Sequence, residues 1–273
     1  MLLLLHVLML SLLSSGSAKV VQDFESECGQ FFANGKSPTR FPESQYKQIC
    51  QTLYDNVYYA TFYDTHNKIP VYSAYKFEGI MGCTRIESCY LKCIFFLMFN
   101  KILQIDDPNK GQNMDFGRTV NIHMRGINQA LNRDYDNSGY DRGHLAPVYL
   151  ANSQSCADAT FSLTNAAPQA KCFNRIFWWD EELSLGTHLK TACSSQPVYI
   201  VTGVVPDPNN SNRVNVPSHF WTAYCCLDQN NRCSDSGGVI GTNDNNSNIQ
   251  KMSVADLEEE LRNLYGKTFQ LFQ

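Results

Sequence analysis

The most informative stretch of this chain is Tyr140-Asp141-Arg142-Gly143-His144-Leu145-Ala146-Pro147. It is followed by Asn165-Ala166-Ala167-Pro168-Gln169, and then by Asn174 and Trp178 in a segment that we expect to be helical. These segments bring one histidine, one arginine and two amides within reach of a single site. We take that site as the candidate catalytic centre.

The residue types at this site fit the hydrolysis of a phosphodiester, which needs a base, positive charge and stabilisation of the leaving oxygen. His144 is the candidate base, because a neutral imidazole titrates near working pH. Asn174 offers a carbonyl oxygen, a hard ligand of the kind that Mg²⁺ accepts while it keeps most of its waters.

A glutamate in the same helix is expected to hold the waters of the metal through hydrogen bonds. Glu182 lies eight residues after Asn174, which is two helical turns and a little more. Glu181, at seven residues, lies angularly closer to Asn174. The spacing alone therefore does not choose between the two glutamates.

Composition and charge limit the fold and the function. With 273 residues, 43% hydrophobic and 12% aromatic, the chain is long enough for a substantial core, and no repeat or low-complexity linker divides it. We therefore expect a single domain over residues 19–273. The formal net charge of -4 counts against a tight, static complex with nucleic acid. It counts less against a hydrolase, which needs positive charge only at the scissile phosphate.

The beginning of the chain and its cysteines indicate secretion. Residues 1–18 combine an apolar stretch from Leu2 to Leu13 with small residues up to Ala18, as in a signal peptide, and the stretch is too short for a stable membrane span. Eleven cysteines indicate disulfides formed in an oxidising compartment, and the odd number leaves at least one thiol free or intermolecular. Sequons at Asn209 and Asn245, in polar stretches, predict a glycoprotein.

The hydrophobic pattern predicts strands and helices in irregular order, which is an α+β fold. We expect a hairpin of Val57–Tyr63 and Ile69–Tyr75, a buried central strand Val198–Val205 and a further strand His219–Leu227. We also expect a helix Asn174–Leu189 and a C-terminal helix Val254–Tyr265, which Ser253 begins and Gly266 ends. Ile80 to Leu103, far more apolar than its neighbours, is interpreted as an insertion or an artefact of sequence assembly, with a buried strand as the alternative.

From about Val57 to Phe272, the chain resembles the DNA/RNA non-specific endonucleases with a ββα-metal (His-Me finger) core, and among them the endonuclease domain-containing 1 group. The resemblance rests on Asp141-Arg142-Gly143-His144, on Thr164-Asn165-Ala166-Ala167-Pro168-Gln169, and on Asn174 with Trp178 and Glu182. It implies a central, mainly antiparallel sheet flanked by helices. It also implies a secreted endonuclease that cleaves DNA and RNA with little sequence preference and grips the sugar-phosphate backbone.

The same resemblance implies a role for each site residue. His144 is the general base, and Asn174 is the sole direct protein ligand of Mg²⁺, which Mn²⁺ could replace. Glu182, rather than Glu181, organises the waters of the metal, and Arg142 and Asn165 support the phosphate and the site geometry. A water bound to Mg²⁺ would protonate the leaving 3′ oxygen and give 5′-phosphate ends.

The chain departs from the family pattern at two arginines. Gly186 stands four residues after the glutamate, where many relatives carry an arginine. The transition-state arginine of the relatives should fall in the Ile80 to Leu103 segment, where Arg85 is the sole arginine. Two functional classes follow: an active Mg²⁺-dependent endonuclease, or a catalytically weak relative that acts as an extracellular binding or immune protein. The sequence does not determine the oligomeric state or the preference between DNA and RNA.

Overall fold

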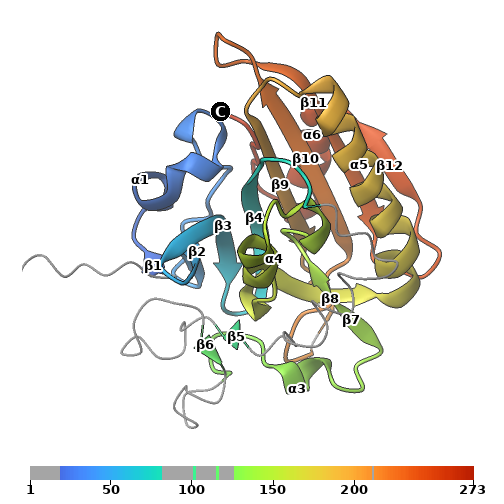
Figure 1. The fold of residues 1–273 in the computed structure, drawn as a ribbon. Coiled ribbons are helices and arrows are strands. Elements are labelled where there is room, and N and C mark those ends of the chain that lie inside the picture. The colour runs from blue at the N-terminus through green and yellow to red at the C-terminus, as the bar shows by residue number, and fades with distance from the viewer. Residues whose placement is uncertain (1–18, 82–100, 103–114, 117–125, 211) are drawn as a thin grey trace, which may run out of the picture.

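An eight-stranded sheet runs through the centre of the molecule (Figure 1), in the order β1-β2-β3-β4-β9-β10-β11-β12. The computed structural model describes residues 19–81, 101–102, 115–116, 126–210 and 212–273. Every neighbouring pair of strands in this sheet is antiparallel. The strands are β1 (Lys19–Val21), β2 (Tyr46–Leu53), β3 (Asn56–Asp64), β4 (Ile69–Phe77), β9 (Val198–Val205), β10 (His219–Leu227), β11 (Cys233–Thr242) and β12 (Ile249–Met252).

Helices cover both faces of this sheet. On one face, Phe24 of α1 (Phe24–Cys28) and Leu257 of α6 (Val254–Tyr265) share a core cluster with the sheet. On the other, Ala159 of α4 (Gln154–Thr160) and Leu189 of α5 (Trp179–Ala192) belong to a second cluster. The α+β architecture with a central antiparallel sheet, expected from the sequence, is confirmed.

Strand β9 is buried on both faces, which explains why it is mostly apolar, with Thr202 as the one hydroxyl-bearing aliphatic residue. Val201 and Val205 point to the α1/α6 side, whereas Val198 and Ile200 point to the α5 side. The predicted central strand is confirmed with identical bounds, between β4 and β10.

Other predicted elements are also observed. β3 and β4 form the expected hairpin, and β10 has the predicted bounds. Helix α6 begins after Ser253, whose hydroxyl accepts a hydrogen bond from the Asp256 N–H, and it ends at Gly266 with φ of 66°. Strand β2 was missed, because it lies in a segment that reads as polar and interrupted by Gly and Pro, and pairing with β3 creates it.

The histidine motif forms a separate hairpin with the second motif. Strand β7 (Tyr140–His144) pairs antiparallel with β8 (Ala166–Ala170), and a helix follows directly (Figure 1). The expected helix is longer and less regular than predicted: a π-helical segment, Phe173–Trp178, precedes α5. Strand, strand and helix together make the ββα unit that carries the candidate site.

Disulfides tie the elements together, as the cysteine content predicted. Among the described residues, the pairs are Cys28–Cys50, Cys193–Cys226 and Cys225–Cys233, and Cys156 and Cys172 are free. Cys225 and Cys226 are adjacent on β10, and adjacent residues of a strand point to opposite faces. One therefore bonds to β11 and the other to the residue that follows α5.

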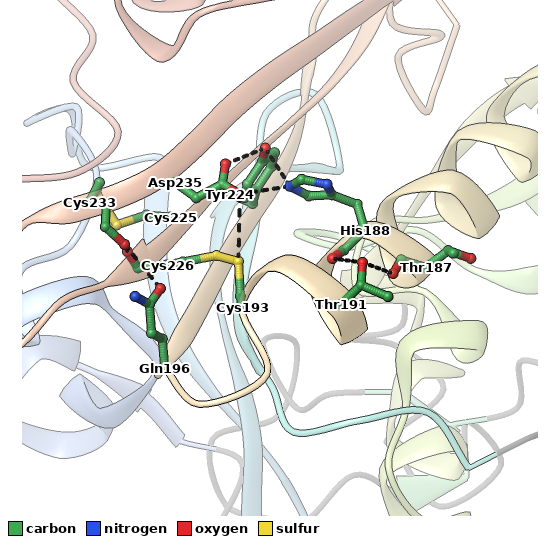
Figure 2. Close-up of a disulfide and its surroundings, with 11 residues drawn as sticks. Thr187, His188, Thr191, Cys193, Gln196, Tyr224, Cys225, Cys226, Cys233 and Asp235 are labelled. Atoms are coloured by element: carbon green, nitrogen blue, oxygen red, sulfur yellow. Dashed lines mark hydrogen bonds and ion pairs between the residues drawn. A yellow bond between two sulfur atoms is a disulfide. The ribbon is translucent and has the colours of Figure 1, made fainter.

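The end of α5 carries a polar cluster beside the second of these disulfides (Figure 2). The Nε2 atom of His188 lies 2.9 Å from the Asp235 carboxylate, and the Tyr224 hydroxyl donates to the same carboxylate at 3.0 Å. His188, Cys193 and Asp235 bring potential metal-ligand atoms within 4.8 Å of one another. Because the Cys193 sulfur is bonded to Cys226, it offers no thiolate, and the cluster fastens α5 to the sheet.

Three sequence-based interpretations fall largely on residues outside those described: the signal peptide at 1–18, the origin of Ile80 to Leu103, and the transition-state role of Arg85. At the near edge of that segment, Ile80 packs against the α5-side cluster. None of the helices in the described part of the chain has the length and apolar character needed to cross a membrane.

Candidate active site

His144 ends strand β7, where it pairs with Ala166 across the hairpin. Its ring makes an edge-to-face contact with Phe161, with 5.0 Å between the ring centroids. Burial lowers the pKa of His144 from 6.5 to about 4. At neutral pH the imidazole is therefore uncharged, the state that a general base requires.

Asn174 lies in the π-helical segment and is fixed by the same hairpin. Its Nδ2 donates to the Asp141 carboxylate at 3.0 Å, and Arg175 donates two hydrogen bonds of 2.7 Å to that carboxylate. Burial alone would raise the pKa of Asp141, but the hydrogen bonds from Arg175 and Asn174 outweigh it and lower the pKa. Asp141 is thus a carboxylate that sets the orientation of the Asn174 amide.

This contact engages the Nδ2 atom of the amide and leaves its Oδ1 atom available for another partner. Within the part of the chain that the structure describes, no hydrogen bond engages Oδ1. The Asn174 side chain is half-buried and its NH2 group is held by a carboxylate. An amide oxygen oriented in this way suits a small hard cation, which takes few protein ligands and keeps several waters. The residues present therefore fit Mg²⁺ or Mn²⁺.

The π-helical segment also affects which of the two glutamates shares a helix face with Asn174. A π-turn contains about one residue more than an α-turn. The eight residues from Asn174 to Glu182 thus act as about seven residues of an α-helix, which come within about 20° of two full turns. This geometry predicts Glu182 on the Asn174 face, whereas a regular α-helix would favour Glu181.

The surroundings of the two glutamates agree with this rotation. Glu181 forms an ion pair of 2.8 Å with Lys251 on β12. Burial raises the pKa of Tyr75 on the sheet. Glu182 lies close enough for its charge to raise that pKa further. Glu181 is thus occupied at the sheet edge, and Glu182 faces the centre of the sheet below α5.

Asn165 lies beneath the hairpin and is fully buried. Its Oδ1 accepts from the Ala146 N–H and the Ser73 hydroxyl, both at 2.9 Å. Its Nδ2 donates to the carbonyls of Ala146 and Thr160. These four bonds use the whole capacity of the amide. No group of Asn165 is left for a phosphate, so its expected part in catalysis reduces to fixing the backbone that follows His144.

Arg142 points away from the helix-covered face of the hairpin. Its guanidinium donates to the Asn132 carbonyl at 3.1 Å, lies 3.4 Å from Asp136 and lies over the Tyr135 ring at 5.2 Å. These contacts join the hairpin to the short helix α3 (Asn132–Tyr135). They support the hairpin structurally, and the expected contact of Arg142 with phosphate stays a prediction.

Gly186, where the family resemblance led us to expect an arginine, is buried in α5. A Cβ atom there would lie 3.0 Å from Ile80 and Leu150 and 3.1 Å from Tyr149. Apolar side chains thus fill the space that a longer residue would need. The packing around Gly186 therefore favours a residue without a side chain at this position.

Sequence reasoning assigned no role to Asp141, although it stands within the motif. Its position next to Arg142 carried no signal of its own, because the contacts to Asn174 and Arg175 span more than thirty residues.

A family model for the DNA/RNA non-specific endonucleases matches residues 37–268. This chain belongs to that family. The structure of this endonuclease-family chain is similar to a chain in the crystal structure of the EndoG/EndoGI complex, with a TM-score of 0.55, 18% identity and 91% of each chain covered. At that identity the likeness shows the fold alone, and it supports the ββα-metal nuclease fold.

Two kinds of curated relatives match the endonuclease-family chain. The human "Endonuclease domain-containing 1 protein" is 32% identical over 205 residues, which are 73% of this chain and 39% of that protein. The bovine mitochondrial endonuclease G is 35% identical over 132 residues, 42% of each chain. The chain thus spans about two fifths of the length of these relatives. The family expected from the motifs is confirmed.

Proposed function

We propose that this chain is a metal-dependent endonuclease that hydrolyses phosphodiester bonds of DNA and RNA with little base preference. The observation that carries the proposal is the hydrogen bond between Asp141 and Asn174, on the hairpin that ends in the neutral His144. It gives one ββα unit both a base and an oriented hard ligand. The family membership supports nucleic acid as the substrate.

In this mechanism each residue acts on a specific group. His144 accepts the proton of the attacking water on its unprotonated ring nitrogen. Asn174 would hold Mg²⁺ or Mn²⁺ through Oδ1, and Glu182 would orient the hydration shell of the ion. When bound, the ion supplies the positive charge that balances the phosphorane and the leaving oxygen. Asn165 and Asp141 keep the base and the ligand in place.

The test is nicking of supercoiled plasmid and degradation of RNA by the purified full chain in Mg²⁺. We expect activity that EDTA abolishes, and a loss of more than a hundredfold for His144→Ala and for Asn174→Ala. His66→Ala, an exposed histidine in the turn between β3 and β4, is the matched control and should retain activity. No cleavage by the intact chain in Mg²⁺, with a cooperative unfolding transition, would refute the proposal.

A second function is supported by the packing around Gly186. The space beside Gly186, where the family resemblance led us to expect an arginine, is filled by Ile80, Tyr149 and Leu150. Without the positive charge of that arginine, electrostatic stabilisation is lost and the chemistry slows by orders of magnitude. A catalytically weak protein that binds nucleic acid or acts as an extracellular binding or immune protein would follow. In the same experiment it would retard plasmid in a gel without nicking it.

We also propose that the chain is secreted after loss of residues 1–18, as one domain over residues 19–273. The disulfides among the described residues support an oxidising compartment. Sequencing the N-terminus of protein from the culture medium tests the cleavage, and the mass lost on enzymatic deglycosylation tests the sequons. Retention of protein with an intact residue 1 inside the cells would contradict it.

A further inference from the structure

Gln169 of β8 is fully buried, and among the described residues neither its Oε1 nor its Nε2 has a hydrogen-bond partner. An unpaired buried amide costs about as much free energy as the hydrogen bonds it has lost. Buried side-chain amides in proteins are usually paired, so this one calls for an explanation. The contacts of Gln169 show where a partner would have to come from.

The side chain of Gln169 lies on the hairpin face that the helix covers. Gln169 pairs with Asp141 across the hairpin, and directly opposed residues share a face. Asp141 uses this face to bind Asn174 and Arg175 of the π-helical segment. The unpaired amide and the candidate metal ligand therefore occupy the same interface between hairpin and helix.

The direction of the side chain follows from Gly143. A Cβ atom on Gly143 would lie 2.2 Å from Oε1 of Gln169 and 2.7 Å from its Cβ, far inside normal contact. The amide therefore lies over Gly143, next to His144 in the chain. It is placed between the Asp141–Asn174 contact and the His144 end of the strand. Only glycine at position 143 leaves room for it.

A second glutamine allows a comparison within the same molecule. Gln129 is also fully buried, and neither of its amide atoms has a partner in the part of the chain that the structure describes. It lies in the segment before α3, where the neighbouring Ala130 N–H donates to the Tyr63 hydroxyl, and it is not part of the hairpin. Gln129 and Gln169 are thus both buried without a partner, but of the two Gln169 alone lies at the interface that contains Asn174.

We propose that Gln169 is a positioning residue for the divalent cation, whose hydration shell supplies the missing partner. Its Oε1 accepts a hydrogen bond from a water that the cation brings into the interface, while Asn174 is the direct ligand. Mg²⁺ and Mn²⁺ keep such waters, and outer partners of this kind typically change metal affinity about 10- to 100-fold. The inference rests on the proposed function, because it requires that Asn174 holds a cation.

The test is a titration of the full chain with Mn²⁺, in which electron paramagnetic resonance measures the free ion. Thermal unfolding without metal is measured alongside. Gln169→Met keeps the volume but removes the amide. We expect Mn²⁺ binding weakened about 10- to 100-fold, with an unfolding temperature equal to or above that of the parent chain. The control Gln129→Met should leave Mn²⁺ affinity within twofold of the parent chain.

A second variant, Gln169→Glu, keeps an acceptor oxygen and should bind Mn²⁺ more tightly than Gln169→Met. The proposal is overturned if Gln169→Met binds Mn²⁺ within twofold of the parent chain, or if Gln169→Glu binds as weakly as Gln169→Met. If the parent chain binds Mn²⁺ no better than Asn174→Ala, both the proposed function and this inference fail. A parent chain that binds Mn²⁺ and a Gln169→Met variant that binds equally well refute the inference alone.

Discussion

Protonation of His144 is expected to destabilise the folded protein in mildly acidic solution. Burial lowers the pKa of this imidazole from 6.5 to about 4 in the folded chain. Between these values the unfolded chain binds the proton and the folded chain does not, so stability falls as the pH falls. The contribution is fully present above pH 6.5 and lost by about pH 4. At about 1.4 kcal/mol for each pH unit, it amounts to about 3 kcal/mol.

The assay is urea unfolding of the oxidised chain between pH 7 and pH 4, for the parent protein and for His144→Gln, which does not titrate. Carboxylates affect both proteins equally, so the difference between their free energies of unfolding isolates His144. We expect this difference to shrink by about 3 kcal/mol over that range, a large part of a typical stability of about 5–15 kcal/mol. His66→Gln, in an exposed turn, should follow the parent curve.

Parallel curves for the parent protein and His144→Gln would refute the reasoning, because they would mean that the ring is as easily protonated folded as unfolded. The same pKa sets the acid limit of activity. The acid limb of kcat/KM should lie at about pH 4–5 in an active enzyme, below the 6.5 of an ordinary histidine.

Three further variants test the site and the attachment of α5 to the sheet. Asp141→Ala frees the Asn174 amide to rotate, so Mn²⁺ affinity should fall about 10- to 100-fold; unchanged affinity in a titration would contradict its orienting role. Gly186→Arg should lower the free energy of unfolding by at least about 2 kcal/mol without raising plasmid nicking, because the site is already filled; a more active, equally stable variant would show that the packing yields. Replacing Cys193 and Cys226 by alanine should cost about 2–4 kcal/mol in denaturant unfolding, and an unchanged midpoint would mean that the polar cluster alone holds α5.

The histidine motif and the second motif could be recognised from the sequence because their chemistry is local. His144 and Asn174 were assigned from residue type and motif context, and the structure places both on one ββα unit. Strand β9 was predicted with identical bounds, since an apolar run bounded by prolines has few alternatives. Strand β2 was missed because its pattern makes sense only beside β3.

The choice between Glu181 and Glu182 shows where sequence reasoning reaches its limit. Helical spacing assumes a regular α-helix, and one π-helical segment rotates everything after it by about one residue. Hydrogen-bond saturation is equally invisible in a sequence. Asn165 belongs to a recognised motif, and its four buried hydrogen bonds engage both polar atoms of its side-chain amide.

The sequence by itself determined the family, the fold class and the candidate base and metal ligand of the site, because residue types and short-range periodicity are local properties. Only the tertiary structure decided that a π-helical segment precedes α5, which cysteines pair, that Asp141 orients the ligand and that apolar side chains fill the space beside Gly186. These depend on distances between segments far apart in the chain. Packing sets such distances, and a local pattern does not contain them.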